Sequence, residues 1–320
     1  MYMFKYILKR IGLMLLTFSI IFTVCFVLIK MLPIDDSTVG VGEDAGKLKA
    51  MMEARGYYEP IMKQYFLYIK RIFQGDLGIG INMPEYRMKN VWDVFVEKLP
   101  PTILINIYSS LIAVPTGIAL GIFAALKKNK WQDHLISTTV MVFISVPGFV
   151  YASLLLFILC FKLGWFPLTM KAGFDYFTWP MFKSMLPAVF AMSFGSIAGY
   201  ARFTRAELTE VLTSEFMLLA RTKGLTKAQA TTRHALRNAM VPIFPSIVGE
   251  FISVMSGSLI IERIFAIPGV GRLYLTAINA PDYDFFMMLS GFYLLIGLAA
   301  SLVIDLSYGV IDPRIRMGAK

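Results

Sequence analysis

The sequence has few charged residues and almost no groups that bind metals or form disulfides. Lys, Arg, Asp and Glu make up 16% of its 320 residues, against about 25% in a typical soluble domain, while 57% are hydrophobic. Cys25 and Cys160 both lie in apolar stretches and are expected to be small buried residues, neither a disulfide nor a metal site. His134 and His234 are a hundred residues apart and form no local metal motif. The composition excludes an ordinary soluble domain, and no metal site is predicted.

Motifs for catalysis and for nucleotide binding are also missing. There is no G-x-x-x-x-G-K-[ST] phosphate loop: Gly46-Lys47 is followed by Leu48, and Val41 stands where the first glycine should be. The sequence has no Gly-x-Ser-x-Gly motif and no paired carboxylates within an apolar stretch. We therefore expect a protein that is not an enzyme and that binds no cofactor itself.

What the sequence does contain is six long apolar stretches. A membrane span needs about 20 apolar residues, because the hydrocarbon core is about 30 Å thick and a helix rises about 1.5 Å per residue. The sequence predicts an all-α integral membrane protein with about six transmembrane helices, at about residues 11–32, 99–126, 135–161, 184–201, 241–261 and 285–311. The first stretch follows basic residues, as a signal peptide would, but it is long enough to span and lacks a small-residue cleavage pattern. We expect it to be a retained anchor helix.

The distribution of basic residues predicts the orientation of these spans. With the N-terminus inside, the four cytoplasmic segments carry 16 Lys and Arg residues, whereas the short outer loops 162–183 and 262–284 carry 5. Short cytoplasmic loops of membrane proteins carry an excess of Lys and Arg. Both termini are therefore predicted to be cytoplasmic, and the net charge of +10 is explained by topology without nucleic acid as a partner.

Two polar segments are too long to be simple turns. The N-terminal region, residues 1–98, combines the first span with an extracellular segment in which apolar residues at 61, 65, 69, 72 and 73 predict an amphipathic helix. Gly75 and Gly78 follow it, as expected at a helix end.

The cytoplasmic segment 202–238 is the more informative of the two. It predicts two short helices around Gly224, and Thr226 with Gln229 three residues later is the pattern of a capping box. Two spans can be joined by a few residues, so an ordered segment of this length indicates a partner protein.

At this segment the sequence resembles the inner-membrane components of binding-protein-dependent ABC importers, in their dipeptide, oligopeptide and nickel branch. The resemblance rests on residues 220–225 (ARTKGL) and 234–242 (HALRNAMVP), with further matches at 64–78, 99–102, 261–272 and 312–316. When the wider family's loop motif is aligned on Gly224, its glutamate and closing proline are absent, and the form seen here is similar to the peptide-branch variant. The resemblance covers about residues 1–317.

The resemblance implies a type I ABC importer transmembrane fold with a cytoplasmic coupling helix, a permease core at residues 99–312 and a cytoplasmic tail at 313–320. It also implies a second homologous permease subunit, two ATP-binding subunits that bind ATP and Mg, an extracellular substrate-binding protein and surrounding membrane lipid. The expected function is to form half of a pathway for di- or oligopeptides across the cell membrane. The residues it assigns to the ATPase-coupling loop are Glu215, Ala220, Arg221, Lys223, Gly224, Leu225, His234, Arg237 and Asn238.

Two carboxylates interrupt the predicted spans, and charge within a membrane is costly. Glu250 could face the pathway and meet the amino terminus or a basic side chain of a peptide, or it could be a neutral or paired group inside the bundle. Asp305 is close in sequence to Arg314 and Arg316, which favours a structural ion pair.

Other functions stay open at this point. One is a nickel or metal-chelate permease of the same family, although the spans offer no cluster of nickel ligands. Another is a secondary transporter or channel acting alone, against which stand the scarcity of intramembrane charge and the large basic loop. The third is a membrane-bound enzyme or scaffold, which the missing catalytic residues and the specific loop motifs oppose.

Overall fold

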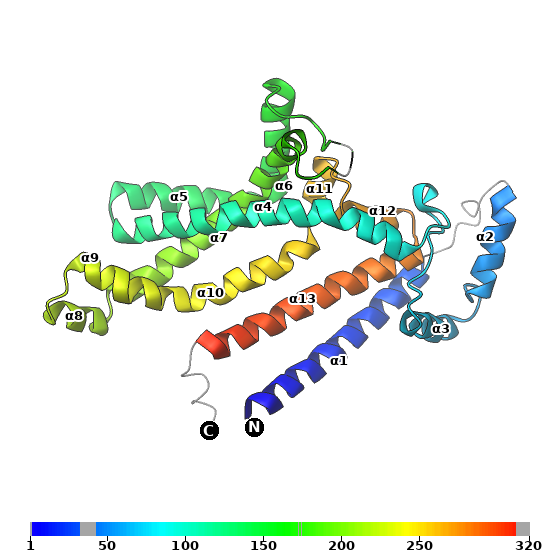
Figure 1. Ribbon diagram of the computed structural model, residues 1–320, viewed down its shortest axis with the longest axis horizontal. Coiled ribbons are helices and arrows are strands. Elements are labelled where there is room, and N and C mark those ends of the chain that lie inside the picture. Colours follow the sequence, from blue (N-terminus) through cyan, green and yellow to red (C-terminus); the bar gives the residue numbers. More distant parts are fainter. Residues whose placement is uncertain (1, 33–42, 172, 174, 312–320) are drawn as a thin grey trace. The chain divides into compact units, whose positions relative to one another are not determined.

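The computed structural model describes residues 2–32, 43–171, 173 and 175–311 (Figure 1). The described residues are mostly helical, and their extended pairing is limited to two isolated bridges, Ile79 with Asn90 and Gly80 with Arg87. The predicted all-α class is confirmed. The predicted tail, residues 313–320, and the expected partners of Asp305 lie outside the described residues.

The chain forms two compact units. Unit 1 comprises residues 1–102 and 268–299, and unit 2 comprises 103–267 and 300–320. Unit 1 therefore adds residues 268–299 to the predicted N-terminal region 1–98.

Five of the predicted spans correspond to long apolar helices. These are α1 (Tyr2–Lys30), α4 (Val91–Leu126), α7 (Trp179–Leu212), α10 (Leu236–Ser253) and α13 (Tyr283–Ile311). The fourth span is longer than predicted, because α7 continues from the apolar stretch 184–201 into the charged residues up to Leu212. By length and composition, the described chain has five candidate spans, or six if one bent pair crosses the membrane as a unit.

The bent pair lies where one span was predicted at 135–161. Helix α5 (Trp131–Ser145) and helix α6 (Gly148–Leu155), which continues as the π-helix η2 (Leu156–Lys162), meet at an angle of 98°. Pro147 lacks a backbone N–H and disfavours helical geometry at the residue before it, and Val146 is extended at φ −88° and ψ 126°. The proline therefore breaks the predicted single span.

The fifth span also ends earlier than the predicted 241–261. Helix α10 passes into a 3-10 turn, η4 (Val254–Ser256), and Gly257 then adopts a positive φ of 63°. The short helix α11 (Leu259–Ile264) starts afresh, with the Ser258 hydroxyl accepting a hydrogen bond from the Ile261 N–H at 3.4 Å. The glycine and the new cap separate Leu259–Ile264 from the span.

Unit 1 contains the predicted amphipathic helix. It is α3 (Ile61–Phe73), between α2 (Glu43–Ala54) and the turn η1 (Pro84–Tyr86), and Gly75 follows it at φ 81°, as expected. Its apolar face packs on α1: the ring centroids of Tyr68 and Phe26 are 5.8 Å apart, and the hydroxyls of Tyr65 and Thr23 are 2.8 Å apart. In this structure α3 therefore packs part of its apolar face, Tyr65, Ile69 and Ile72 beside the buried Tyr68, on the first span, whereas Ile61 and Phe73 are exposed.

A buried carboxylate joins two distant parts of unit 1. Asp282, between α12 (Val270–Asn279) and α13, accepts hydrogen bonds through one oxygen from the backbone N–H groups of Ile81, Asn82 and Met83 at 2.7, 2.8 and 3.3 Å. Next to it, Asp284 accepts the Ile79 N–H at 3.1 Å. These bonds fix the loop before η1 to the start of the last span.

In unit 2, α7 is the central helix. Helices α5, α6 and α10 pack against it. Helix α4 approaches it closely at two glycines: a Cβ at Gly121 would lie 2.6 Å from the Ala201 carbonyl oxygen, and one at Gly117 would lie 2.6 Å from the Tyr200 Cβ. Larger residues at these positions would force the two spans apart.

Candidate functional site

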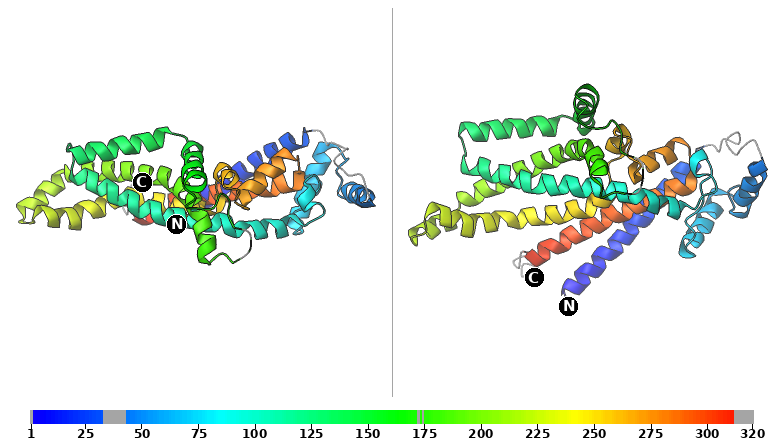
Figure 2. Two further views of the ribbon diagram at one scale, coloured as in Figure 1. Left: turned by 90° about the horizontal axis from the view of Figure 1, so that it is seen from above. Right: turned by 45° about the horizontal axis from the view of Figure 1, so that its top comes forward.

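The segment predicted to meet a partner forms a helical hairpin between α7 and α10. It consists of α8 (Glu215–Thr222), α9 (Lys227–Ala230) and the π-helix η3 (Thr231–Ala235), which leads into α10. In Figures 1 and 2 the hairpin lies at the end of α7 and α10 in every view. Two short helices were predicted here and are confirmed, and the first residues of the predicted segment 202–238 continue α7 as far as Leu212.

The turn of the hairpin has the local structure that the sequence indicates. Gly224 adopts φ +90°, a conformation that favours glycine, and its N–H donates to the Arg221 carbonyl at 3.0 Å. The Thr226 hydroxyl accepts a hydrogen bond from the Gln229 N–H, and the Gln229 side chain accepts one from the Thr226 N–H. The predicted capping box is confirmed, and it fixes the direction in which α9 leaves the turn.

Small apolar residues hold the hairpin against the spans. Its core consists of Ala125, Leu208, Met217, Ala220, Ala230, Ala235 and Ala239, with Leu225 partly buried against it. Alanines at most of these positions let the short helices lie close to α4 and α7. Ala220 and Leu225 therefore have structural positions within the predicted site.

The other predicted coupling residues are on the surface. Glu215, Arg221, Lys223, Gly224, His234, Arg237 and Asn238 are all exposed. Helix α8 also exposes three large apolar side chains, Phe216 at 41%, Leu218 at 65% and Leu219 at 56%. The structure brings the predicted residues onto one hairpin but does not gather them into a cluster.

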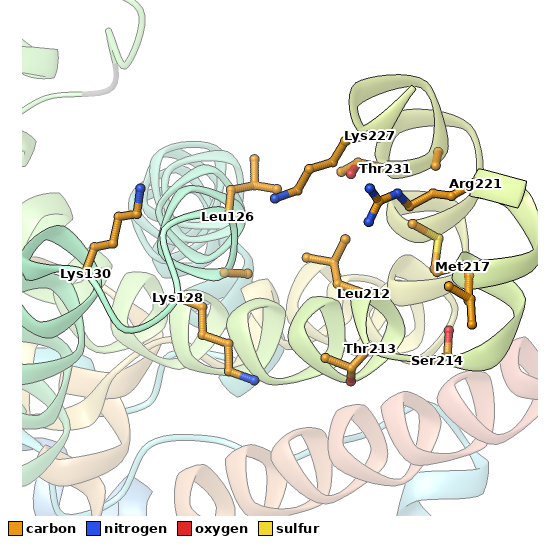
Figure 3. A pocket seen from close by; sticks show the side chains of 13 residues that line it. Leu126, Lys128, Lys130, Leu212, Thr213, Ser214, Met217, Arg221, Lys227 and Thr231 are labelled. Carbon is orange, nitrogen blue, oxygen red and sulfur yellow. The ribbon is translucent and has the colours of Figure 1, made fainter. Parts of the chain in front are cut away.

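A pocket of about 560 Å³ lies between the hairpin and the turn that joins α4 to α5. Four cations line it: Lys128 and Lys130 from the turn, and Arg221 and Lys227 from the hairpin. Figure 3 shows Arg221 and Lys227 pointing into the pocket, with Leu126 across from them. Of these four residues only Arg221 was predicted for the site, and Lys128 and Lys130 could not be placed beside it because they are about ninety residues away in the chain.

An ion pair positions the α4–α5 turn. The buried Asp133 carboxylate accepts two hydrogen bonds from the Arg205 guanidinium on α7, at 2.5 and 2.8 Å, and one from the Asn129 N–H at 2.9 Å. Asn129 has a positive φ of 63°, as the tight turn between the two helices requires. This paired contact places the lysines of the turn beside the hairpin. The distribution of charges along the sequence does not predict this ion pair.

Glu250 lies within α10, away from the hairpin. It is half-buried and accepts a hydrogen bond from the Ser196 hydroxyl on α7 at 3.1 Å. This contact joins two spans of unit 2 and is compatible with both roles considered for Glu250.

Comparison with known proteins identifies the family. The family model for the binding-protein-dependent transport system inner membrane component matches residues 117–317, and the model of its N-terminal region matches residues 3–106.

Curated relatives match over nearly the full length. The dipeptide transport system permease protein DppB of Lactococcus lactis subsp. cremoris is 32% identical over 98% of this chain and 100% of its own. The glutathione transport system permease protein GsiC of Escherichia coli O6:H1 is 32% identical over 98% of this chain and 99% of its own.

A solved structure supports the fold. The crystal structure of an amino acid ABC transporter with histidines matches 68% of this chain and 94% of its own, with a TM-score of 0.50 and 20% sequence identity. That likeness confirms the type I ABC transporter permease fold. The chain belongs to the family of inner membrane components of binding-protein-dependent transport systems, and its role is in transport and not in catalysis.

Proposed function

We propose that this chain is the permease subunit of an ATP-driven importer and forms half of the translocation pathway for di- or oligopeptides. The observation that carries the proposal is the full-length relation to a dipeptide permease, and the related glutathione permease is named for another small peptide. Family membership supports operation within a multi-component system, which argues against a carrier acting alone.

The proposed assembly contains a second homologous permease, two ATP-binding subunits and an extracellular substrate-binding protein. ATP and Mg are bound by the ATP-binding subunits, since this chain has no phosphate loop. The chain crosses the cell membrane several times with both termini in the cytoplasm, an orientation supported by its excess of basic residues on the proposed inner loops. The α8–α9 hairpin is then cytoplasmic.

The hairpin is the proposed contact with an ATP-binding subunit. Phe216 and Leu219 are three residues apart on α8, so they share one side of the helix, and both are exposed. Exposed apolar side chains rimmed by polar groups are typical of protein interfaces. Lys223 and Arg237 add positive charge that can meet acidic groups of the partner. Movement of the ATP-binding subunit would reach α7 and α10 through the packed alanine core.

Glu250 is proposed as a residue of the pathway, where its carboxylate meets the amino terminus or a basic side chain of a peptide. Its half-buried position between α10 and α7 is compatible with this role. A Glu250→Gln variant is expected to transport basic peptides more slowly and neutral ones normally. Unchanged uptake of basic peptides would exclude the role.

The function is tested by purifying the tagged chain from its native host in mild detergent and identifying the co-purifying subunits by mass spectrometry. The recovered complex is then reconstituted in vesicles, and uptake of a labelled dipeptide is measured with and without ATP. Recovery with a second permease and ATP-binding subunits, together with ATP-dependent uptake, supports the proposal. Recovery alone, or uptake driven by an ion gradient without ATP, contradicts it.

The coupling role is tested separately with Phe216→Ser and Leu219→Ser. Both are expected to weaken association with the ATP-binding subunits and to reduce uptake. Leu163→Ser is the matched control, because Leu163 is an equally apolar exposed residue after η2, away from the hairpin. Equal loss in all three variants would indicate a general effect of removing exposed apolar side chains and not a coupling interface.

A further inference from the structure

The pocket between the α4–α5 turn and the hairpin contains positive charge without compensation. Lys128, Lys130, Arg221 and Lys227 line it, and within the described residues none of the four is paired with a carboxylate. The lining includes no acidic residue. Unpaired cations around one cavity indicate that its ligand is an anion.

The pocket also has an apolar side. Leu126 from α4, Leu212 from α7, and Met217 and Leu218 from α8 contribute to its lining. The hydroxyls of Thr213 and Ser214 donate to backbone carbonyls, so the lysines and the arginine are the charged groups that can contact an anion. A ligand that fits this lining combines a negative charge with apolar groups.

The position of the pocket along the spans indicates where that ligand comes from. The apolar stretch of α4 runs from Leu99 to Leu126, about 42 Å of helix, which is the thickness of a bilayer with its head groups. The turn that follows is therefore at head-group level. Trp131, at the start of α5, is 70% exposed, and Leu135 is exposed one turn later, as is typical of residues that face lipid near the interface.

We propose that this pocket binds the phosphate group of an anionic phospholipid, with Lys128, Lys227 and Arg221 around the phosphate and Leu126 and Leu218 beside the lipid's apolar part. Basic pockets between membrane helices on one face of the bilayer bind anionic head groups in this way. An acidic side chain of an ATP-binding subunit fits the charge too, but the helix geometry favours the lipid. Leu218 and Arg221, three residues apart, face the pocket, whereas Phe216 and Leu219 are on a different side of α8.

The bound lipid would have a structural role. It would join the α4–α5 turn to the hairpin through a negative charge that the lining of the pocket does not supply. Anionic lipid in the membrane would then stabilise the hairpin against the spans, before any ATP-binding subunit is present.

The test uses the full chain, purified in detergent without other subunits. Native mass spectrometry measures the binding of phosphatidylglycerol, with phosphatidylcholine as the uncharged comparison. The wild-type chain is expected to retain phosphatidylglycerol preferentially, and Lys128→Gln/Lys227→Gln to bind it about tenfold more weakly or worse. Both lysines are exposed, so the double variant should fold normally, which circular dichroism and gel filtration check. Arg233→Gln is the matched control: it removes an exposed cation of the same hairpin that does not line the pocket, and binding should not change.

Three outcomes overturn the proposal. The first is equal retention of phosphatidylglycerol by the double variant and the wild type. The second is displacement of the lipid by inorganic phosphate at equal concentration, which would make the site one for a free anion. The third is the absence of any preference of the wild-type chain for phosphatidylglycerol over phosphatidylcholine, which would mean that the pocket does not recognise an anionic lipid. These results do not depend on peptide uptake, so they are separate from a failure of the proposed transport function.

Discussion

Thr226 and Gln229 cap each other's backbone at the first turn of α9. The Gln229 N–H donates to the Thr226 hydroxyl at 3.3 Å, and the Thr226 N–H donates to the Gln229 side-chain oxygen at 3.0 Å. Thr226→Ala removes one of these bonds and is expected to destabilise the local helix by about 1 kcal/mol. Hydrogen exchange of residues 227–235, followed by mass spectrometry, should accelerate about fivefold. Thr226→Ser keeps the hydroxyl and should exchange like the wild type; unchanged exchange in both variants would mean that tertiary packing alone holds α9.

Gly224 has a positive φ, but an added Cβ would meet no atom within 4 Å. Gly224→Trp should therefore insert and fold, with local strain of about 1–2 kcal/mol from the backbone alone. Under the proposed function, the indole would block the partner's approach, so ATP hydrolysis should continue without uptake. Gly224→Asn is the control for strain, because asparagine tolerates this conformation. Normal uptake by the tryptophan variant would contradict a close contact at this turn.

The Asp133–Arg205 pair should be important for stability because the carboxylate is buried. Arg205→Ala leaves that charge without its main partner and is expected to lower the free energy of unfolding by about 3 kcal/mol or more. The double variant Asp133→Asn/Arg205→Gln removes both charges and should lose less. Thermal unfolding in detergent measures the stability of both variants. A double-mutant cycle then gives the interaction energy between the two side chains. Additive losses would show that the two side chains do not interact in solution.

Asp282 is expected to stabilise unit 1 by accepting hydrogen bonds from three backbone N–H groups. Asp282→Ala would leave the N–H groups of Ile81, Asn82 and Met83 without this acceptor, at a cost of about 3 kcal/mol. Asp282→Asn keeps a carbonyl acceptor and should lose less. Limited proteolysis between residues 74 and 90 is a direct measurement, because release of this loop should expose it to cleavage. Equal resistance of the alanine variant would contradict the role.

The same carboxyl predicts a pH dependence. Burial raises the pKa of Asp282 to about 6, although the backbone hydrogen bonds from residues 81–83 act in the opposite direction. The folded state therefore holds its proton more tightly than the unfolded chain, whose aspartates titrate near pH 4. The contribution of the Asp282 carboxyl to the free energy of unfolding is complete below about pH 4 and is lost as the pH rises through about 6. The difference in free energy of unfolding between the wild type and Asp282→Asn, measured by thermal unfolding across this pH range, should fall as the pH rises. A difference that does not change with pH would contradict the prediction.

Much of the secondary structure was predictable from local sequence. The amphipathic helix Ile61–Phe73 follows from the spacing of its apolar residues, and the capping box of α9 follows from two residues in one turn. Local signals were also present where the helices differ from the predicted spans. Pro147 breaks the predicted span at 135–161, and Gly257 with Ser258 separates α11 from α10, so the apolar runs were longer than the helices they contain.

The sequence by itself determined that this protein is a bundle of membrane helices with a basic, capped hairpin between two spans. These features arise from hydropathy, turn residues and capping, which act over a few positions. Only the tertiary structure decided that Asp133 pairs with Arg205, that Lys128 lies in one pocket with Arg221 and Lys227, and that Asp282 holds residues 81–83. Each of these contacts joins residues that are about seventy to two hundred positions apart. No local pattern records them, because which charges meet depends on how the helices pack.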